Sequence, residues 1–315
     1  MRCVVTGCAG FVGSTLTDRL LRDGHTVVGI DDLSTGRDAF LEAARRSAAF
    51  SFHRVDLLEA ARLPELVDGA DIVLHLAANA DVRFGTEHPT KDFEQNARAT
   101  LNILEAMRAT GVKKIAFSST GSIYGEAREI PTPEFTAIPV QTSLYGASKI
   151  AAESFIEAYC EGFGMQAWIF RFVSLMGERY THGHVVDFVR QLQEHPDRLY
   201  VLGNGAQRKS YLYIGDCVDA MLIALERAKA KVNILNLGHD EYCTVKDSIG
   251  WICARLGLRP ELTYAGGDRG WVGDNPFIFL NCAAMRAHGW APTISIRAAV
   301  ELTVDYLRGA EPALR

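Results

Sequence analysis

The sequence lacks paired cysteines. Its 315 residues include seven cysteines, which are odd in number, widely spaced and without a Cys-x-x-Cys pair. Disulfide frameworks and zinc knuckles depend on such pairs, so we expect neither. Reduced thiols are typical of the cytosol, and we therefore predict a cytoplasmic protein.

Long apolar runs and blocks of one charge are also missing. The N-terminal apolar run stops at Thr6 and Gly7, which is too short for a signal peptide, and no later run approaches the roughly 20 residues that span a membrane. The net charge is only -5, and basic and acidic residues are dispersed. Nucleic-acid and membrane partners are therefore not expected.

A glycine-rich segment follows the first apolar run. Residues 3–5 predict a buried strand, and glycines then recur at three-residue intervals before an amphipathic helix. Such glycines let the backbone approach a pyrophosphate, whose charge meets the helix N-terminus. A tight turn that only permits close helix packing is the alternative, but the order strand, turn, helix favours dinucleotide binding. The expected contacts are Gly7, Gly10, Phe11, Val12 and Gly13.

Acidic residues follow the next predicted strand, residues 26–30. A carboxylate of Asp31 or Asp32 at that strand end can accept hydrogen bonds from the adenosine ribose, and it would repel a 2′-phosphate. NAD is therefore favoured over NADP, although Arg37 stands nearby in sequence. We predict NAD as the cofactor.

Two further strands are predicted over residues 50–55 and 71–78. Asp56 and Leu57 end the first of them and could touch the adenine ring, although a helix N-cap is the alternative for Asp56. The second runs into small residues that suit a backbone pressed against a cofactor. The expected contacts there are Leu76, Ala77 and Ala78.

Strands and helices alternate five times through residue 117, with a helix over 92–110 and a fifth strand over 113–117. This alternation predicts an α/β fold with a Rossmann-type, doubly wound parallel sheet, whose ligands lie beyond the carboxyl ends of the strands. His75, inside the fourth strand, is interpreted as structural. Three amphipathic helices over 216–228, 245–256 and 296–307 are expected to pack a smaller C-terminal α/β lobe.

A tyrosine and a lysine stand one helical turn apart at Tyr145 and Lys149. A phenol has a reference pKa of about 10, so it is a poor base at neutral pH until a nearby cation stabilises the phenolate. The spacing alone recurs on ordinary solvated helices. The dinucleotide motif upstream favours a catalytic role for the pair.

Together these motifs resemble the extended short-chain dehydrogenase/reductase family, within it the nucleotide-sugar 4-epimerases that act on UDP-glucose or UDP-glucuronate. The resemblance covers nearly the whole chain and implies tightly bound NAD, a UDP-sugar substrate and a homodimer. It also implies a catalytic triad of Thr120, Tyr145 and Lys149, with Thr120 beside the substrate. The NAD contacts that it implies are Gly7, Gly10, Gly13, Asp31, Asp56, Asn96, Tyr145 and Lys149.

The residues after Thr120 exclude close relatives. Related sugar-nucleotide dehydratases carry Asp-Glu at the positions of Gly121 and Ser122. Related decarboxylases carry a glutamate at the position of Ser122. Without that acid/base group, oxidation and re-reduction of sugar carbon 4 is favoured. Nucleotide-sugar dehydratases and ketoreductases stay remoter alternatives. A non-catalytic NAD-binding regulator is another, although such proteins tend to lose the tyrosine or the lysine.

The second half resembles the family's nucleotide-sugar lobe. Ser174 stands where many members have an asparagine on the diphosphate, Arg208 or Lys209 is the expected phosphate cation, and Arg269 lies where a second arginine is expected. His182 and His184 lack acidic or cysteine partners at metal-ligand spacing, so no metal is predicted. The full set of implied substrate contacts is Arg83, Thr120, Gly121, Ser122, Ser174, Arg179, His184, Val185, Tyr200, Val201, Arg208, Lys209, Arg269 and Asp274.

The favoured sugar is a uronic acid. Arg83 and Arg179 fall near the expected sugar pocket, where an arginine would pair with a carboxylate at carbon 5. The segments around them look like those of UDP-glucuronate 4-epimerases, which favours UDP-glucuronate and UDP-galacturonate; UDP-glucose and UDP-N-acetylglucosamine are the alternatives. The expected division is an NAD-binding domain over 1–170, with 211–237 returning to it, and a nucleotide-sugar lobe over 171–315.

Overall fold

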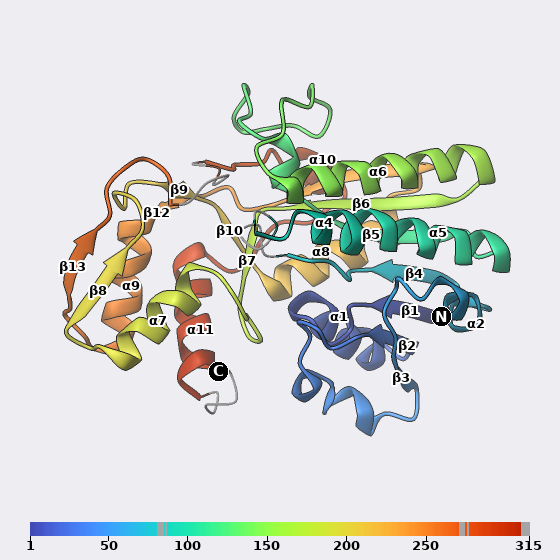
Figure 1. The fold of residues 1–315 in the computed structure, drawn as a ribbon, viewed down its shortest axis with the longest axis horizontal. Coiled ribbons are helices and arrows are strands. Elements are labelled where there is room, and N and C mark those ends of the chain that lie inside the picture. The colour runs from blue at the N-terminus through green and yellow to red at the C-terminus, as the bar shows by residue number, and fades with distance from the viewer. Residues whose placement is uncertain (81–84, 86, 271–274, 276, 310–315) are drawn as a thin grey trace. The chain divides into compact units, whose positions relative to one another are not determined.

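In the computed structural model, which describes residues 1–80, 85, 87–270, 275 and 277–309, seven strands form one parallel sheet (Figure 1). Their order is β11-β6-β5-β4-β1-β2-β3, so the chain winds outward in one direction from β1 and in the other from β4. This confirms the predicted doubly wound α/β fold. The strands are β1 (Arg2–Thr6), β2 (Thr26–Asp31), β3 (Phe50–Arg54), β4 (Ile72–His75), β5 (Lys114–Thr120), β6 (Gln166–Phe172) and β11 (Val232–Leu237).

The chain divides into two compact units. The first consists of Met1–Ile123, Ser143–Arg171 and Met221–Leu235, and the second of Tyr124–Thr142, Phe172–Ala220 and Asn236–Arg315. Each unit contains segments from distant parts of the sequence. The helix α8 (Ile214–Arg227) begins in the second unit and ends in the first.

Helices of the first unit cover the sheet on both faces. Core residues of α2, α5 and α6 pack with Val4, Val28 and Val73 of the strands, in a single buried cluster. Because side chains alternate along a strand, Trp168 points to the opposite face, where its indole N–H is 3.0 Å from Ala228 O at the end of α8. The helices are α1 (Phe11–Arg22), α2 (Leu63–Val67), α4 (Pro89–Asp92), α5 (Ala99–Thr110) and α6 (Leu144–Phe163), with α5 and α6 side by side (Figure 1).

The helix predicted over 92–110 is interrupted. A π-helical segment, η4 (Phe93–Arg98), lies between α4 and α5 and buries Asn96. The wider π turn rotates the residues around it relative to an α-helix, which is why such segments recur near functional sites. α5 then ends, as expected, at Gly111 with a φ of 79°.

Short 3₁₀ turns connect several of these elements. They are η1 (Asp38–Leu41), η2 (Ala44–Arg46), η3 (Ala60–Arg62) and η5 (Gly121–Tyr124). The last of them follows β5 directly, so the chain turns sharply just beyond Thr120.

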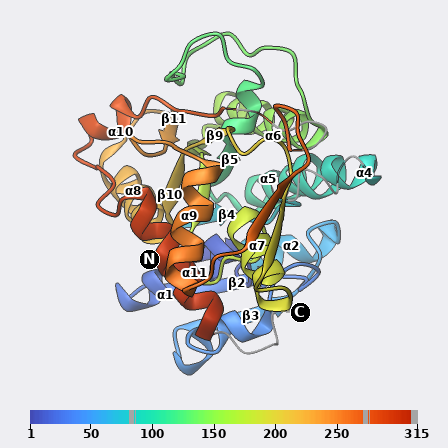
Figure 2. The ribbon, with the colours of Figure 1, turned by 90° about the vertical axis from the view of Figure 1, so that its left-hand side faces the viewer.

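In its described residues, the second unit combines three short strand pairs with helices. Figure 2 shows α7, α9 and α11 beside one another, in agreement with their contacts. The strand pairs are β7 (Ser174–Met176) with β10 (Tyr211–Tyr213), β9 (Arg208–Lys209) with β12 (Cys243–Thr244), and β8 (Arg198–Val201) with β13 (Glu261–Tyr264). The helices are α7 (His184–Glu194), α9 (Val245–Leu256), α10 (Ala283–Ala287) and α11 (Ile296–Gly309).

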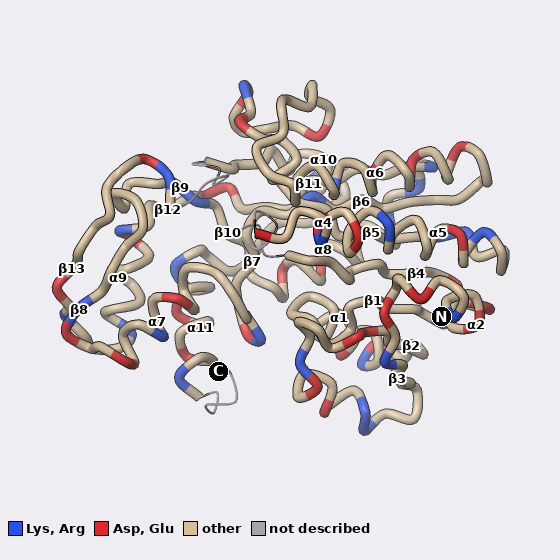
Figure 3. The backbone as a smooth tube through the Cα atoms, viewed as in Figure 1, with Lys and Arg blue, Asp and Glu red and all other residues tan. Residues whose placement is uncertain are grey.

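Charges are interspersed along the described chain, as Figure 3 shows. In the part of the chain that the structure describes, no helix is long and apolar enough to cross a membrane.

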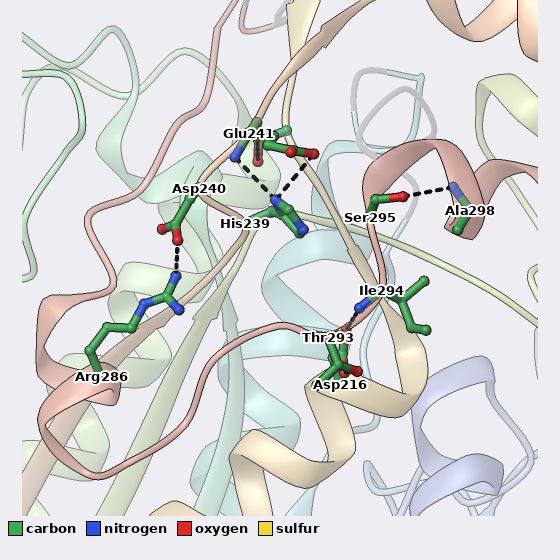
Figure 4. Close-up of polar contacts among 10 residues, drawn as sticks. Asp216, His239, Asp240, Glu241, Arg286, Thr293, Ile294, Ser295 and Ala298 are labelled. Atoms are coloured by element: carbon green, nitrogen blue, oxygen red, sulfur yellow. Dashed lines mark hydrogen bonds and ion pairs between the residues drawn. The ribbon is translucent and has the colours of Figure 1, made fainter.

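A buried carboxylate ties the start of α8 to the chain before α11 (Figure 4). Asp216 accepts hydrogen bonds from the Thr293 hydroxyl at 2.7 Å and from the backbone N–H groups of Thr293 and Ile294 at 3.0 Å each. Nearby, Asp240 pairs with Arg286 of α10 at 2.5 Å, but that carboxylate is exposed. The Asp216 contacts are therefore the stronger structural link.

Asp216→Ala should destabilise the second unit. It removes three hydrogen bonds to a buried carboxylate, which we expect to cost roughly 2 kcal/mol or more and to lower Tm by about 5 °C. Differential scanning calorimetry measures this change. Glu226→Ala, at an exposed position of the same helix, is the matched control, and equal effects of the two variants would contradict the assignment.

Candidate active site

A cavity opens where the strand order reverses. Its lining includes Gly7 and Gly10 after β1, Asp31 and Asp32 after β2, and the residues that follow β4. This is the position at which doubly wound sheets bind ligands. The predicted cofactor residues that line it are Gly7, Gly10, Asp31, Asp32, Asp56, Leu57, Leu76, Ala77 and Ala78.

Several lining residues were not predicted. Ser34, Thr35 and Gly36 form part of the wall, as does Gln95 in the π-helical segment. The turn-forming composition after Asp31 and Asp32 was an available signal for the first three. Nothing local in the sequence indicated Gln95, because its position depends on how η4 packs.

The glycine loop leaves space that a side chain would fill. Gly7 has a φ of 70°, and a Cβ atom there would lie 2.7 Å from the Ala77 backbone nitrogen. A Cβ atom on Gly13 would lie 1.9 Å from the Gly7 carbonyl oxygen. Only glycine fits at both positions, so the start of α1 can approach a ligand closely. Helix α1 has no side-chain cap and no acidic residue in its first turn, so its N-terminal N–H groups suit an anion.

A buried histidine, His75, contacts the end of the strand that leads into this loop. His75 Nδ1 is 2.7 Å from Thr6 Oγ1 and its Nε2 is 2.9 Å from Thr100 Oγ1. Burial, with the charge of Lys149, lowers the pKa of His75 to about 3, so the ring is neutral. Thr6 Oγ1 also accepts the backbone N–H groups of Leu76 and Ala77. His75 is therefore a structural residue that links the ends of β1 and β4.

Asp31 is fixed at the cavity wall. One carboxylate oxygen accepts the Ala9 N–H at 2.9 Å and the other the Leu33 N–H at 2.8 Å. Burial raises the pKa of Asp31. A carboxylate has about four acceptor sites, so two remain for the hydroxyls of a ribose.

The neighbouring carboxylates, of Asp32 and Asp56, each accept a backbone N–H two residues further along the chain and so stabilise a turn. Asp32 accepts the Ser34 N–H at 2.8 Å, and Asp56 accepts the Leu58 N–H at 2.9 Å. Asp56 thus caps the turn after β3, and both side chains still line the cavity.

Tyr145 and Thr120 are brought together. Tyr145 lies in the first turn of α6, where Ser143 caps the helix by accepting the Gly146 N–H at 3.0 Å. Its hydroxyl lies close enough to the Thr120 side chain, at the end of β5, for a hydrogen bond between them to lower the tyrosine pKa. Burial raises the pKa of Tyr145 to about 12, against the opposing effect of that hydrogen bond.

Lys149 lies behind the tyrosine. Its Nζ donates to the Ser118 carbonyl oxygen at 2.9 Å and lies 4.7 Å from the Phe117 ring centroid and 6.0 Å from that of Tyr145. The residue is only 1% exposed. Burial lowers the pKa of Lys149 to about 7, although Glu153 and Asp92 oppose this shift. The sheet therefore holds a cation beside the phenol, as the helical spacing predicts.

Both polar groups of the Asn96 side chain are hydrogen-bonded within the protein. Its amide oxygen accepts the Asn79 N–H at 2.9 Å, and its amide nitrogen donates to Ser148 Oγ at 2.9 Å. Asn96 thus connects the chain after β4 to α6. Its expected contact with NAD remains a prediction.

Gly121 and Ser122 follow Thr120 in the 3₁₀ turn η5. The Ser122 hydroxyl lies 3.2 Å from Thr120 Oγ1, and its N–H donates to the same oxygen at 3.1 Å. The Thr120 side chain is therefore held by the turn that begins directly after it. Phe11 and Val12 begin α1 at the loop described above.

In the second unit, the predicted residues of the β7–α7 segment differ in exposure. Ser174 is exposed, Val185 is fully buried, and Arg179 has a φ of 67°, a left-handed conformation that is costly for arginine. His184 Nε2 is 2.7 Å from Ser248 Oγ, and burial lowers its pKa to about 3. The His184 side chain is thus part of the packing, which leaves its backbone for the expected contact.

The other predicted residues of this unit lie on β8, β9 and the chain before α10. Val201 is fully buried and Tyr200 is half exposed. Arg208 stacks on Phe277, with 4.1 Å between guanidinium carbon and ring centroid, and Lys209 Nζ donates to Asn275 O at 2.7 Å. Arg269 is paired with Glu126. Arg83 and Asp274 lie outside the described residues.

Comparison with known proteins identifies the family. The pattern of the NAD dependent epimerase/dehydratase family matches residues 3–238. The chain belongs to this family. It is 31% identical to a UDP-glucose 4-epimerase of Mycolicibacterium smegmatis over 98% of this chain and 99% of that protein. A crystal structure of a UDP-galactose 4-epimerase has a TM-score of 0.87 at 37% identity, covering 98% of this chain and 99% of the other.

A second structure is of a UDP-glucuronic acid 4-epimerase from Bacillus cereus in complex with UDP-glucuronic acid and NAD. Its TM-score is 0.90 at 26% identity, and it covers 98% of this chain and 99% of the other. The expected resemblance to extended short-chain dehydrogenases/reductases is confirmed. So are the NAD cofactor and the assignment as an NAD-dependent nucleotide-sugar epimerase.

The residues present in this epimerase/dehydratase fit NAD. The glycine loop and the N-terminus of α1 would hold the pyrophosphate, and Asp31 would hold the adenosine ribose. Among the described residues, no group of three or more His, Cys, Asp and Glu side chains could hold a metal ion.

Lys149→Met should stabilise the fold while removing the cation beside Tyr145. The pKa of Lys149 is about 7 when folded and near its ordinary value of 10.5 when unfolded. Between these values the unfolded chain binds more protons, so Lys149 disfavours the folded state at neutral pH and this effect fades as pH rises. We expect the stability gain of the variant to shrink by roughly 2 kcal/mol between about pH 7 and pH 9.

Denaturant unfolding at both pH values measures that gain as a difference between variant and wild type. Other groups that titrate in the same range cancel in this difference. Lys114→Met, at an exposed lysine of β5, is the control. A gain for Lys149→Met that does not change with pH would contradict the burial of a titrating amine.

Proposed function

We propose that the protein is a UDP-sugar 4-epimerase that acts through a 4-keto intermediate, with UDP-glucuronate and UDP-galacturonate as its favoured pair. The observation that carries the proposal is that the Tyr145 hydroxyl lies within hydrogen-bonding reach of Thr120, with Lys149 6.0 Å from its ring, in the unit that contains the dinucleotide cavity. A base, an orienting hydroxyl and a cation are the groups that reversible oxidation of an alcohol needs.

Tyr145 acts as the general base and acid. As phenolate it takes the proton of the sugar 4-hydroxyl, and it returns a proton to the carbonyl oxygen of the 4-ketose after the sugar has turned about its diphosphate. Thr120 orients the reacting oxygen. When bound, NAD supplies the nicotinamide that accepts the hydride of carbon 4 and gives it back to the opposite face.

Lys149 makes this base available at neutral pH. Burial raises the pKa of Tyr145 to about 12, which alone would keep the phenol protonated. A positive charge 6.0 Å from the ring would favour the phenolate over the phenol. The charge of an oxidised nicotinamide would act in the same direction.

The turn after Thr120 favours epimerisation over elimination. Gly121 and Ser122 carry no carboxyl group, and the Ser122 hydroxyl is engaged with Thr120. A dehydratase needs a general acid and base to remove water from the 4-keto sugar. The protein therefore has the groups for hydride exchange but not, in this turn, those for dehydration.

The nucleotide part is assigned to the second unit and NAD to the first. Arg269, Arg208 and Lys209 are the proposed cations for the diphosphate, with Arg179 or Arg83 for a carboxylate at carbon 5. The Bacillus cereus structure, which contains UDP-glucuronic acid, supports the uronate. The relatives of higher identity are named for UDP-glucose and UDP-galactose, which favours the neutral hexoses as the second candidate.

A cytoplasmic homodimer is also part of the proposal. The cysteines are all free thiols, in keeping with a reducing compartment. Phe155 and Phe163 of α6 are 39% and 43% exposed, and Phe93 is 60% exposed. Apolar side chains gathered on helices in this way suit a helical interface with a second copy of the chain.

Tyr145→Phe should reduce turnover at least 1000-fold without unfolding the protein, because the phenyl ring keeps the packing and loses the proton acceptor. NMR analysis of reactions with UDP-glucuronate, UDP-glucose and UDP-N-acetylglucosamine measures turnover and ranks the substrates. NAD released on denaturation verifies that the variant is loaded. An active variant would remove Tyr145 from the mechanism.

Arg179→Leu should separate the uronate from the neutral hexose. If the guanidinium binds the sugar carboxylate, kcat/KM should fall about 100-fold for UDP-glucuronate and about threefold or less for UDP-glucose. Arg259→Leu, at an exposed arginine of the same unit, is the control. Equal losses with both sugars would exclude Arg179 as the carboxylate ligand.

A further inference from the structure

Helix α6 carries a third ionisable residue in line with the catalytic pair. Tyr145, Lys149 and Glu153 follow one another at intervals of four residues, so they lie on one face of the helix. Glu153 is only 3% exposed. A carboxylate buried this deeply is retained only where specific partners hold it.

Glu153 has two such partners. Its Oε1 accepts the Ser119 hydroxyl and also Arg171 Nε at 3.1 Å, and its Oε2 accepts Arg171 Nη2 at 2.7 Å. Arg171, on β6, is 4% exposed. This is a buried bidentate ion pair between α6 and β6, where the charges are weakly screened.

The pair is attached to the site through β5. Ser119 stands between Thr120 and Ser118, whose carbonyl oxygen accepts Lys149 Nζ at 2.9 Å. Glu153 and Lys149 therefore each hold one of the two residues before Thr120. Movement of Glu153 would disturb the strand that presents Thr120 and the amine that supports Tyr145.

Among the described residues, four titratable groups interact with the Lys149 amine. They are Tyr145 and Glu153 of α6, Asp92 of α4 and His75 of β4. His75 is neutral because its pKa is about 3, so Glu153 and Asp92 supply the negative charge. Both favour the charged form of a lysine that burial would otherwise neutralise.

We propose that Glu153 is a positioning residue for the epimerase: held by Arg171 and Ser119, it keeps Lys149 charged and placed so that Lys149 can stabilise the Tyr145 phenolate. This inference rests on the proposed function. It adds a buried carboxylate and its arginine to the triad, although neither contacts the reacting sugar in the proposed mechanism.

The test is Glu153→Gln, which keeps size and hydrogen bonding and removes the charge. Glu157→Gln is the matched control, because Glu157 lies one turn further along α6 and also interacts with Glu153 and Arg171. For E153Q we expect kcat at pH 7 to fall about tenfold, KM to change less than about threefold, and the acidic limb of the pH profile to rise by about one unit. E157Q should match the wild type.

A second readout does not depend on turnover. The ultraviolet absorbance of tyrosinate, taken as the difference between each protein and its Tyr145→Phe counterpart, reports the pKa of Tyr145 in the NAD-loaded protein. E153Q should raise this pKa by about one unit. Wild-type protein that turns over none of the UDP-sugars would refute the proposed function, while the titration still decides the role of Glu153.

An unpaired arginine could prevent E153Q from folding. In that case E153Q/R171Q, which removes both charges of the pair and leaves neither unpaired, carries the same test. If the variant that folds has the pH profile and the Tyr145 titration of E157Q, Glu153 has only a packing role and the inference is overturned.

Discussion

The site depends on one costly interaction, the burial of a lysine amine between α6 and the carboxyl end of β5, beside a phenol. Lys149 is 1% exposed, and burial lowers its pKa to about 7. The Ser118 carbonyl, the Phe117 ring and the Glu153 carboxylate offset part of the desolvation. Stability is thus sacrificed for a cation that can act on Tyr145 in a weakly polar environment.

The cofactor cavity likewise depends on close contacts, in this case between backbone segments that only glycine allows. Close approach of Gly7 to Ala77 and of Gly13 to Gly7 leaves no space for side chains, so the helix N-terminus is free to meet an anion. A neutral His75 with hydroxyl partners on both sides supports this geometry from within. The polar groups under the loop are satisfied within the protein, and the N-terminus of α1, which no side chain caps, suits an anion.

Two buried networks converge on α6. One runs from Asn79 through Asn96 to Ser148, and the other from Arg171 through Glu153 to Ser119. The first joins α6 to the chain that follows β4, and the second joins α6 to β5 and β6. The two networks therefore fix both the position of α6 and its rotation about its own axis. Tyr145 requires this precision, because a hydrogen bond forms only over a short distance.

The sequence by itself determined the fold class, the glycine loop, the acidic residue after β2 and the pairing of Tyr145 with Lys149, because each depends on a period or spacing within one segment. Only the tertiary structure decided that Asn96 joins Asn79 to Ser148, that the His184 side chain is packed against Ser248, and that Glu153 pairs with Arg171. Those contacts join residues from 17 to 64 positions apart. Their geometry follows from strand order and helix packing, which no local pattern contains.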